Sequence, residues 1–305
     1  MGKGNGGRNL SALFSVVLGF AAGAVAALLI IFYLGYGRQP EEAKKAAPIP
    51  EGENAAVEEP AGPRKNETTS VEPAIESRPP RVAIVIDDMG RDLNALEELL
   101  KIDAPLAFAV LPRLSLSKDV AEAAYSNGHE VLLHLPMEPK PSTNGQKDND
   151  PGQGALLTSM NSVDVRSMVE DNFKDVPHAS GINNHMGSKF TEDHALMRAV
   201  MEVVKEKNLF FLDSLTTPAS VGSRLAKKMG VKGARRDIFL DNTRDEAYIK
   251  AQINGLAAAA RKRGKAVAIG HPYPETIAAL KEAVPELKKS GIEVISEIEL
   301  AYRFL

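Results

Sequence analysis

The sequence predicts an α/β fold built around a parallel sheet, and three observations support this prediction. From Arg81 to the C-terminus, apolar runs of strand length alternate with segments of helical periodicity. The apolar runs are continuous, which is typical of strands buried on both faces of a parallel sheet. Polar residues follow several of these runs directly. About seven or eight such strand–helix units form a parallel sheet that is either open or closed as a barrel.

Each element is predicted from a local signal. The first apolar run leads straight into two acids, and Pro112 stops the second run. The expected strands cover residues 82–86, 106–111, 130–133, 181–184, 209–212, 238–240, 266–269 and 293–295. The first helix is capped near Asp92, and the second ends before Gly128, a common C-terminal cap. The expected helices cover residues 92–100, 117–127, 162–175, 195–207, 224–229, 245–263 and 275–287.

The 305-residue chain is predicted to begin with a membrane anchor in residues 1–37. No charged residue occurs from Asn9 to Gly37, a span long enough to cross a bilayer as a helix. Two basic residues precede this span and two acidic residues soon follow it, so the positive-inside rule places the N-terminus in the cytoplasm. We therefore expect a single-pass protein of the cytoplasmic (inner) membrane, with its C-terminal domain outside the cytoplasm, in the periplasm. The alternative is a cleaved signal peptide, because the stretch from Ala21 to Ala24 consists of small residues.

Residues 38–80 are rich in Pro, Ala and Glu and are predicted to form a disordered linker before one domain at 81–305. The net charge of -3 and the lack of a long basic run argue against nucleic acid as a partner. The chain has no cysteine, which excludes a disulfide framework and a thiolate metal site.

Polar side chains gather where the predicted strands end. Three of the six histidines directly follow apolar runs, and acids lie beside them. Packing does not easily explain three histidines on separate strands, and the C-terminal ends of parallel strands share one face. We therefore predict a shared site there. Its candidate residues are Asp87, Asp88, His134, Glu138, Asn184, His185, Asp213, Asp241 and His271.

The candidate residues suit metal-assisted hydrolysis. A carboxylate and two imidazoles from Asp88, His134 and His185 would hold a divalent metal, most plausibly Zn²⁺, and leave room for water or substrate. Water activated by such a cation attacks a carbonyl or a phosphoryl centre. Asp87 is expected to serve as a general base, and His271 to protonate the leaving group.

Several of these residues have a second interpretation. Asp87 cannot point the same way as Asp88 if both keep strand geometry, so it could instead form a helix cap or a surface ion pair. Glu138 could ligate the metal or orient a ligand from the second shell. Asn184, Asp213 and Asp241 are expected in the second shell or at the substrate, although both aspartates could simply cap the following helix. The other three histidines, His129, His178 and His194, are interpreted as surface or structural residues.

Four segments of this chain resemble the divergent polysaccharide deacetylase family. They begin at Ile86 (IDDMG), His134 (HLPMEP), Asn183 (NNHMGS) and Gly270 (GHPYPET), and the resemblance covers about Pro80 to Leu305. The resemblance implies a distorted (β/α) barrel related to carbohydrate esterases that remove acetyl groups from N-acetylated sugars. Those enzymes bind a divalent metal through one aspartate and two histidines.

The resemblance also implies roles for particular residues. Asp87 matches the catalytic base of these deacetylases, Asp88 their metal-binding acid and His271 their late catalytic histidine. Met89 separates the acid pair from the glycine that ordinarily follows it directly. The ordinary enzymes take both metal histidines from one segment at i and i+4, whereas here Glu138 lies four residues after His134. The second imidazole is therefore expected to come from another strand, as His185.

We expect a membrane-anchored, extracytoplasmic, metal-dependent deacetylase acting on an N-acetylated glycan of the envelope or the extracellular space. Two alternatives remain open on the sequence alone. A non-catalytic glycan-binding or scaffold protein could retain the same barrel. A metal-dependent phosphoesterase could use the same acids and imidazoles.

Overall fold

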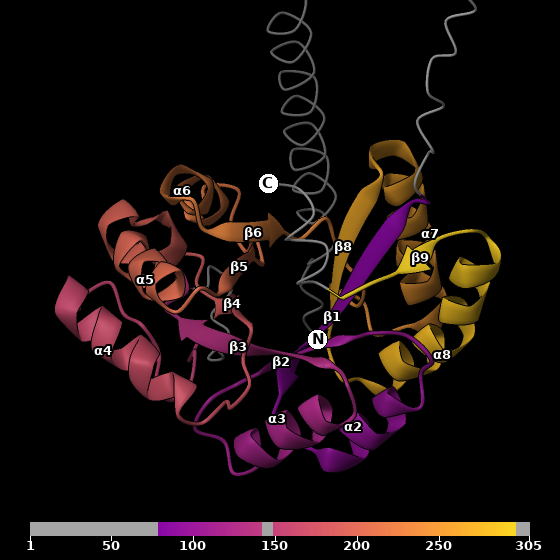
Figure 1. The fold of residues 1–305 in the computed structure, drawn as a ribbon, viewed down its shortest axis with the longest axis horizontal. Helices are drawn as coiled ribbons and strands as arrows, with labels where there is room; N and C mark the ends of the chain where they lie inside the picture. Colours follow the sequence, from indigo (N-terminus) through magenta and orange to yellow (C-terminus); the bar gives the residue numbers. More distant parts are fainter. Residues whose placement is uncertain (1–78, 142–148, 297–305) are drawn as a thin grey trace, which may run out of the picture. The chain divides into compact units, whose positions relative to one another are not determined.

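A curled sheet of parallel strands lies at the centre of the fold, with helices around its outer side (Figure 1). The computed structural model describes residues 79–141 and 149–296. Within these ranges the strand order is β6-β5-β4-β3-β2-β1-β8-β7, β9 pairs with the start of β1, and all these pairs are parallel. The strands are β1 (Arg81–Met89), β2 (Ala107–Val110), β3 (Glu130–Met137), β4 (Gly181–Met186), β5 (Phe210–Asp213), β6 (Lys232–Arg235), β7 (Ile238–Phe239), β8 (Lys265–Gly270) and β9 (Glu293–Val294).

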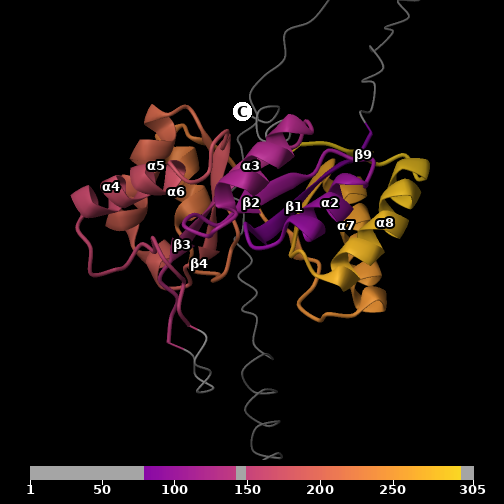
Figure 2. The same ribbon diagram turned by 90° about the horizontal axis from the view of Figure 1, so that it is seen from below.

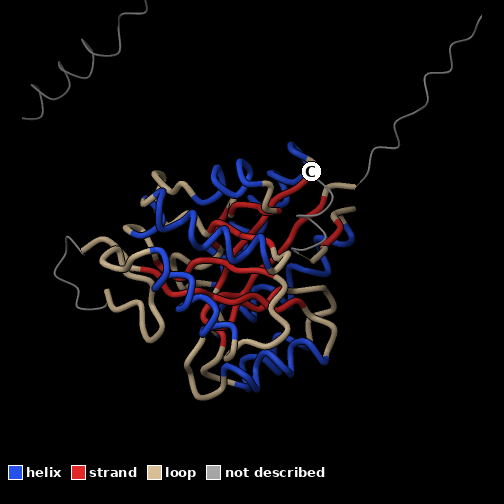
Figure 3. Tube along the Cα trace, turned by 60° about the vertical axis from the view of Figure 1, so that its left-hand side comes forward, coloured by secondary structure: helices blue, strands red, loops and turns tan. Residues whose placement is uncertain are grey.

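The helices connect successive strands and pack against the outside of the sheet, as the blue segments around the red strands show in Figure 3. Side chains cap several of them: Asp92 accepts a hydrogen bond from the backbone N–H of Asn94, and Asp245 accepts one from Tyr248. The helices are α2 (Leu93–Leu100), α3 (Ser117–Ser126), α4 (Ser162–Phe173), α5 (His194–Glu206), α6 (Gly222–Met229), α7 (Glu246–Arg263) and α8 (Pro274–Lys289), with a short 3₁₀ turn, η1 (Phe190–Glu192). Figure 2 shows α4, α5 and α6 on one side of the strands and α2, α7 and α8 on the other.

Two apolar layers fill the domain. The larger one lies between the strands and the helices and includes Ile84, Phe108 and Val200. The smaller one contains no helical residue; its members, such as Val85 and Leu212, come from the inward face of the strands and from the segment after β9. Because side chains alternate along a strand, β1, β2, β3, β5 and β8 each supply residues to both layers. The inward layer positions the polar residues that follow it.

The two strands at the edges of the sheet, β6 and β7, follow each other directly in the sequence. β6 pairs with β5, β7 pairs with β8, and only Arg236 and Asp237 separate β6 from β7. The backbone N–H of Arg236 still donates to the carbonyl of Asp213, the last residue of β5, at 3.0 Å, whereas that of Asp237 donates to the carbonyl of Val267 of β8, at 2.9 Å. The chain therefore crosses from one edge of the sheet to the other within two residues, in keeping with a distorted barrel.

The predicted parallel α/β fold is confirmed, and most predicted elements lie within a few residues of the observed ones. β6 was not predicted, because its sequence, Lys-Gly-Ala-Arg, has no apolar run and its side chains are only intermediate or exposed. Backbone pairing with β5, rather than burial of apolar side chains, makes this segment a strand.

The predicted membrane anchor and linker, residues 1–80, lie almost wholly outside the described part of the chain, which begins at residue 79. Within residues 79–141 and 149–296, no helix has the length and apolar character needed to cross a bilayer.

Candidate metal centre at the strand ends

At the C-terminal ends of four strands, the side chains that face the inside of the barrel are polar. On β1, Asp87 lies two residues after the inward-facing Val85. The same two-residue step along β3 and β8 brings His134 and His271 to the inward face. His185, near the end of β4, completes the group. The predicted convergence of the strand ends therefore follows from the alternation of side chains along each strand.

Asp88 joins this group through a break in strand geometry. Its φ is +58°, and the register between β1 and β2 shifts between Ile86 and Met89. This bulge turns the Asp88 carboxylate to the same side as that of Asp87. Asp88 Oδ1 lies 3.2 Å, and Asp87 Oδ2 3.6 Å, from His134 Nε2. The premise that both acids keep strand geometry is thus wrong, and one imidazole lies close to both carboxylates.

Three donor atoms lie close together at the centre of the site. Asp88 Oδ1 lies 2.9 Å from His185 Nδ1, and His134 Nε2 lies 3.1 Å from the same nitrogen. These residues form a group of ligand atoms within 4.8 Å of one another, as a metal ion requires. Asp88 Oδ1 is buried and receives no well-directed hydrogen bond from a described residue. A buried anionic oxygen without such a partner calls for a cation.

The tautomer of His134 supports the same conclusion. Its Nδ1 lies 2.8 Å from Asn183 Oδ1, an acceptor, so Nδ1 carries a proton that it donates. In the neutral imidazole, the Nε2 lone pair then faces Asp88 Oδ1 and His185 Nδ1. An oxygen anion and a nitrogen lone pair repel each other unless a proton or a metal ion lies between them. The donor set fits a divalent cation.

Electrostatics in the site favour positive charge among these atoms. Burial alone would lower the pKa of His134, but the carboxylates of Asp87 and Asp88 outweigh it and raise that pKa. Burial likewise works against the charged form of Asp88, yet the imidazoles of His134 and His185 hold its pKa far below the ordinary value. A bound cation supplies the same positive charge and displaces the proton.

Asn183 was missed by the sequence analysis. It is buried on β4, and its amide bridges two residues of the site: Oδ1 accepts from His134 Nδ1, and Nδ2 donates to Asp87 Oδ1 at 2.7 Å. It thereby fixes the ring of His134 and holds the Asp87 carboxylate. The available signal was its spacing, because Asn183 precedes His185 by two residues and lies on the same face of β4.

Asp87 is buried, with 3% of its surface exposed. Loss of water around the carboxylate raises its pKa, although His134 and His271 partly oppose this effect. A carboxyl group with a raised pKa is a better proton acceptor than an ordinary aspartate. The hydrogen bond from Asn183 leaves the other oxygen, Oδ2, on the side of His134.

His271 is held by Asp241, which receives three hydrogen bonds. Asp241 Oδ1 lies 2.9 Å from His271 Nδ1, and Oδ2 accepts from the backbone N–H of His271 at 2.6 Å and from Thr276 Oγ1 at 2.8 Å. The opposite ring nitrogen, Nε2, lies 4.0 Å from Asp88 Oδ2. Burial alone would lower the pKa of His271. The nearby carboxylates of Asp241, Asp87 and Asp88 outweigh this effect and raise the pKa to about 9. The imidazole is therefore protonated at neutral pH.

Glu138 lies outside the group of metal ligand atoms. Its carboxylate accepts hydrogen bonds from the backbone N–H and hydroxyl of Thr158, both at 2.6 Å, and pairs with Lys189 at 2.6 Å. Burial alone would raise the pKa of Glu138, but these contacts outweigh it and lower the pKa to about 2. The residue ties the segment after β3 to the segment after β4.

Asn184 and Asp213 also lie away from the metal ligands, because they occupy outward rows of their strands. Asn184 accepts from the backbone N–H of Ser214 at 2.9 Å and donates to the Met186 carbonyl. Asp213 Oδ2 accepts from the hydroxyls of Ser220 and Ser223, each at 2.9 Å, and so holds the segment that leads into α6. Of the four residues predicted for the second shell or the substrate, Asp241 alone contacts a residue of the strand-end group.

The remaining histidines lie elsewhere. His129 packs edge-on against Phe108, and His178 pairs with Glu122 and stacks on Tyr125. His194 begins α5. Their contacts agree with surface or structural roles.

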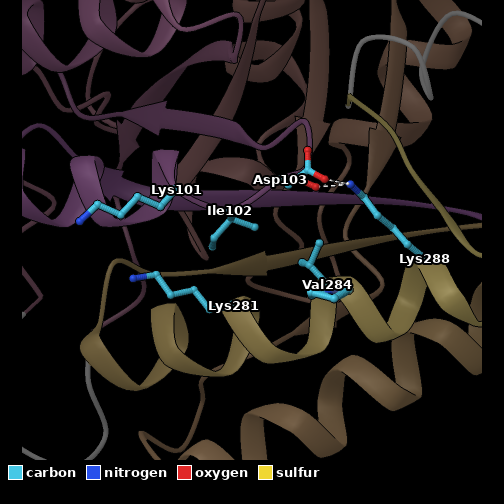
Figure 4. Close-up of a pocket in the computed structure, with 7 residues that line it drawn as sticks. Lys101, Ile102, Asp103, Lys281, Val284 and Lys288 are labelled. Carbon is cyan, nitrogen blue, oxygen red and sulfur yellow. Dashed lines mark hydrogen bonds and ion pairs between the residues drawn. The ribbon is translucent and has the colours of Figure 1, made fainter.

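A pocket of about 570 Å³ between α2 and α8, shown in Figure 4, lies away from the strand ends. Three lysines line it, and each is paired with an acid: Lys101 and Lys281 with Glu98, and Lys288 with Asp103. Because each lysine already has an acidic partner, the pocket does not compete with the strand-end face as a candidate site.

Comparison with known proteins places the chain in a family. Residues 84–300 match the family model for divergent polysaccharide deacetylases. The chain belongs to this family. It is 38% identical over 207 residues to the uncharacterized protein YibQ of Escherichia coli, a match that covers 68% of this chain and 63% of that relative. An uncharacterized protein of Haemophilus influenzae is 37% identical over 207 residues, covering 68% of this chain and 72% of that protein.

A solved structure supports the fold assignment. The crystal structure of an uncharacterized protein from Agrobacterium tumefaciens superposes with a TM-score of 0.67 at 24% identity, covering 73% of this chain and 89% of that one. The resemblance carried by the four segments is thus confirmed at the level of the family.

Proposed function

We propose that this protein is a metal-dependent deacetylase of N-acetylated glycans. One observation carries the proposal: the donor atoms of Asp88, His134 and His185 converge beside Asp87 on one side and the His271–Asp241 pair on another. A metal site flanked by a proton acceptor and a proton donor is the arrangement that amide hydrolysis needs.

Asp88, His134 and His185 would hold the cation, and their oxygen and nitrogen donors suit Zn²⁺. When bound there, a divalent cation polarises a carbonyl group and makes water a stronger acid near neutral pH. Asn183 keeps His134 in the tautomer with Nε2 available, so its hydrogen bond prepares the site for the cation.

Asp87 would take a proton from the water that attacks the acetyl carbonyl carbon. Its raised pKa makes it a stronger base than a solvent-exposed aspartate, and Asn183 fixes its orientation. His271 would then give the proton at Nε2 to the leaving amine nitrogen, because Asp241 retains the Nδ1 proton. The carbon–nitrogen bond breaks, and acetate and the free amine are the products.

The experiment that tests this proposal measures acetate released from chitotetraose, a neutral N-acetylglucosamine oligomer, by the purified full-length protein. We expect release with Zn²⁺, Mn²⁺ or Co²⁺ and its loss after chelation. If the metal-loaded protein binds N-acetylated glycans but releases no acetate, it is a glycan-binding scaffold. Hydrolysis of a phosphate ester such as p-nitrophenyl phosphate, without acetate release, would instead support a phosphoesterase.

We further propose that the domain acts on a glycan outside the cytoplasm, on the periplasmic side of the inner membrane. The proposal rests on the uncharged span from Asn9 to Gly37 and the charges that flank it. A reporter fused after Pro80 should be active outside the cytoplasm and should remain with the membranes at high salt. Soluble protein that starts near residue 25 would show a cleaved signal peptide.

A further inference from the structure

A second pocket, of about 290 Å³, opens beside the candidate metal centre. Asp88 and His271 line both the pocket and the centre, and Gly90, Arg91 and Tyr273 complete its walls together with neighbouring residues. Its volume lies just below the range for whole ligand pockets, about 300–1,000 Å³, so it suits one sugar unit of a longer chain. Whatever occupies this pocket lies next to the reacting group.

Arg91 brings an uncompensated charge to this pocket. Gly90, with φ at +114°, turns the chain at the end of β1, and the exposed Arg91 follows. Arg91 makes no hydrogen bond or ion pair with any residue in the described ranges. The lysines in the pocket of Figure 4 differ in this respect, because each is paired with an acid.

The other charged groups that line the pocket already have partners. The Asp92 carboxylate accepts from the backbone N–H of Asn94 within its own helix, and His271 is paired with Asp241. Asp88 faces the imidazoles of the metal centre. Among the charged groups that line the pocket, the guanidinium of Arg91 is thus the one without a partner in the described part of the chain, and it is free to bind a ligand.

Tyr273 forms a rigid wall of the same pocket. Its ring stacks on His271 with centroids 5.5 Å apart, and the guanidinium of Arg244 lies 4.2 Å from the ring centroid. Arg244 is itself 3.6 Å from Glu275. The phenol oxygen of Tyr273 makes no hydrogen bond with a described residue, so it can form one with a sugar hydroxyl.

We propose that the site selects N-acetylated glycans that carry a carboxylate on a sugar next to the acetylated unit, and that Arg91 binds this carboxylate. The inference rests on the proposed function, because it places the acetamide at the metal centre. A guanidinium matches the planar carboxylate with two parallel hydrogen bonds, and it remains charged at every physiological pH. Arg91 is a specificity-determining residue in this account.

The test compares two tetrasaccharides with the zinc-loaded full-length protein. Chitotetraose is neutral, whereas the hyaluronan tetrasaccharide alternates N-acetylglucosamine with glucuronate. Calorimetry should show tighter binding of the hyaluronan tetrasaccharide. Arg91→Ala should weaken that binding by about 10- to 100-fold, since a hydrogen bond to a charged group is lost, and should weaken chitotetraose binding by far less. Arg91→Lys should retain part of the preference.

Arg224→Ala is the matched control, because Arg224 is an exposed arginine on α6 that also lacks an ion pair with a described residue. It should leave both affinities unchanged. The proposal is overturned if the wild type shows no preference for the hyaluronan tetrasaccharide, or if Arg91→Ala weakens both sugars equally. Acetate release is recorded in parallel: selective, Arg91-dependent binding without acetate would reject the deacetylase and retain this inference.

Discussion

Replacing Asp88, His134 or His185 by alanine is expected to reduce the metal content from about one zinc ion per chain to background. Each of these residues supplies one of three donor atoms that lie within 4.8 Å of one another, and a site with two protein ligands binds zinc poorly. Elemental analysis of the full-length protein after dialysis against trace zinc measures the effect. Acetate release should be lost in all three variants.

Glu138→Gln and Asp213→Asn are the matched controls for this experiment. Both acids lie near strand ends, yet both are engaged in contacts away from the ligand group. They should retain zinc, although each should lower the free energy of unfolding by about 1–3 kcal/mol through weakened charged hydrogen bonds. Undiminished zinc in all three alanine variants, or loss of zinc in the controls alone, would contradict the proposed centre.

Asp87→Asn and His271→Ala are each expected to lower acetate release by about 10²–10⁴-fold, the usual contribution of a general base or a general acid. Asparagine keeps the size of the Asp87 side chain but cannot accept a proton, and alanine removes the proton donor at position 271. Because neither residue supplies one of the three donor atoms, both variants should still bind zinc. Initial rates at saturating substrate measure the effect.

The pH profile separates the two roles. His271 has a pKa raised to about 9, so its acid form is present below that pH and is lost as the pH rises through it. The positive charge of a bound dication would lower this pKa, so the alkaline limb of the wild-type profile should fall at or below about pH 9. His271→Ala should lack this limb. A variant with unchanged rate and an unchanged limb would show that His271 is not the proton donor.

The sequence identifies which polar residues lie at the strand ends, because the signal for each of them is local. An apolar run followed by a histidine or an acid marks both a buried strand and a residue at its C-terminal end, as at His134 and Asp87. Parallel strands place all such residues on one face, so the convergence of Asp87, His134, His185 and His271 needs no knowledge of loop structure.

What the sequence did not predict depends on backbone geometry and on contacts between distant segments. The left-handed conformation of Asp88 decides where its carboxylate points, and an ordinary strand pattern does not reveal it. Asn183, not Asn184, holds the site, because the two residues face opposite sides of β4. The role of Glu138 as a clamp depends on Thr158 and Lys189, which approach it only in the folded chain.

Anomalous diffraction from crystals of the zinc-loaded full-length protein, measured on both sides of the zinc absorption edge, tests the metal centre most directly. We predict one zinc peak per chain, in contact with Asp88 Oδ1, His134 Nε2 and His185 Nδ1. A peak of full occupancy bound to other residues, or no peak at these atoms in protein that carries zinc at one ion per chain, would contradict it.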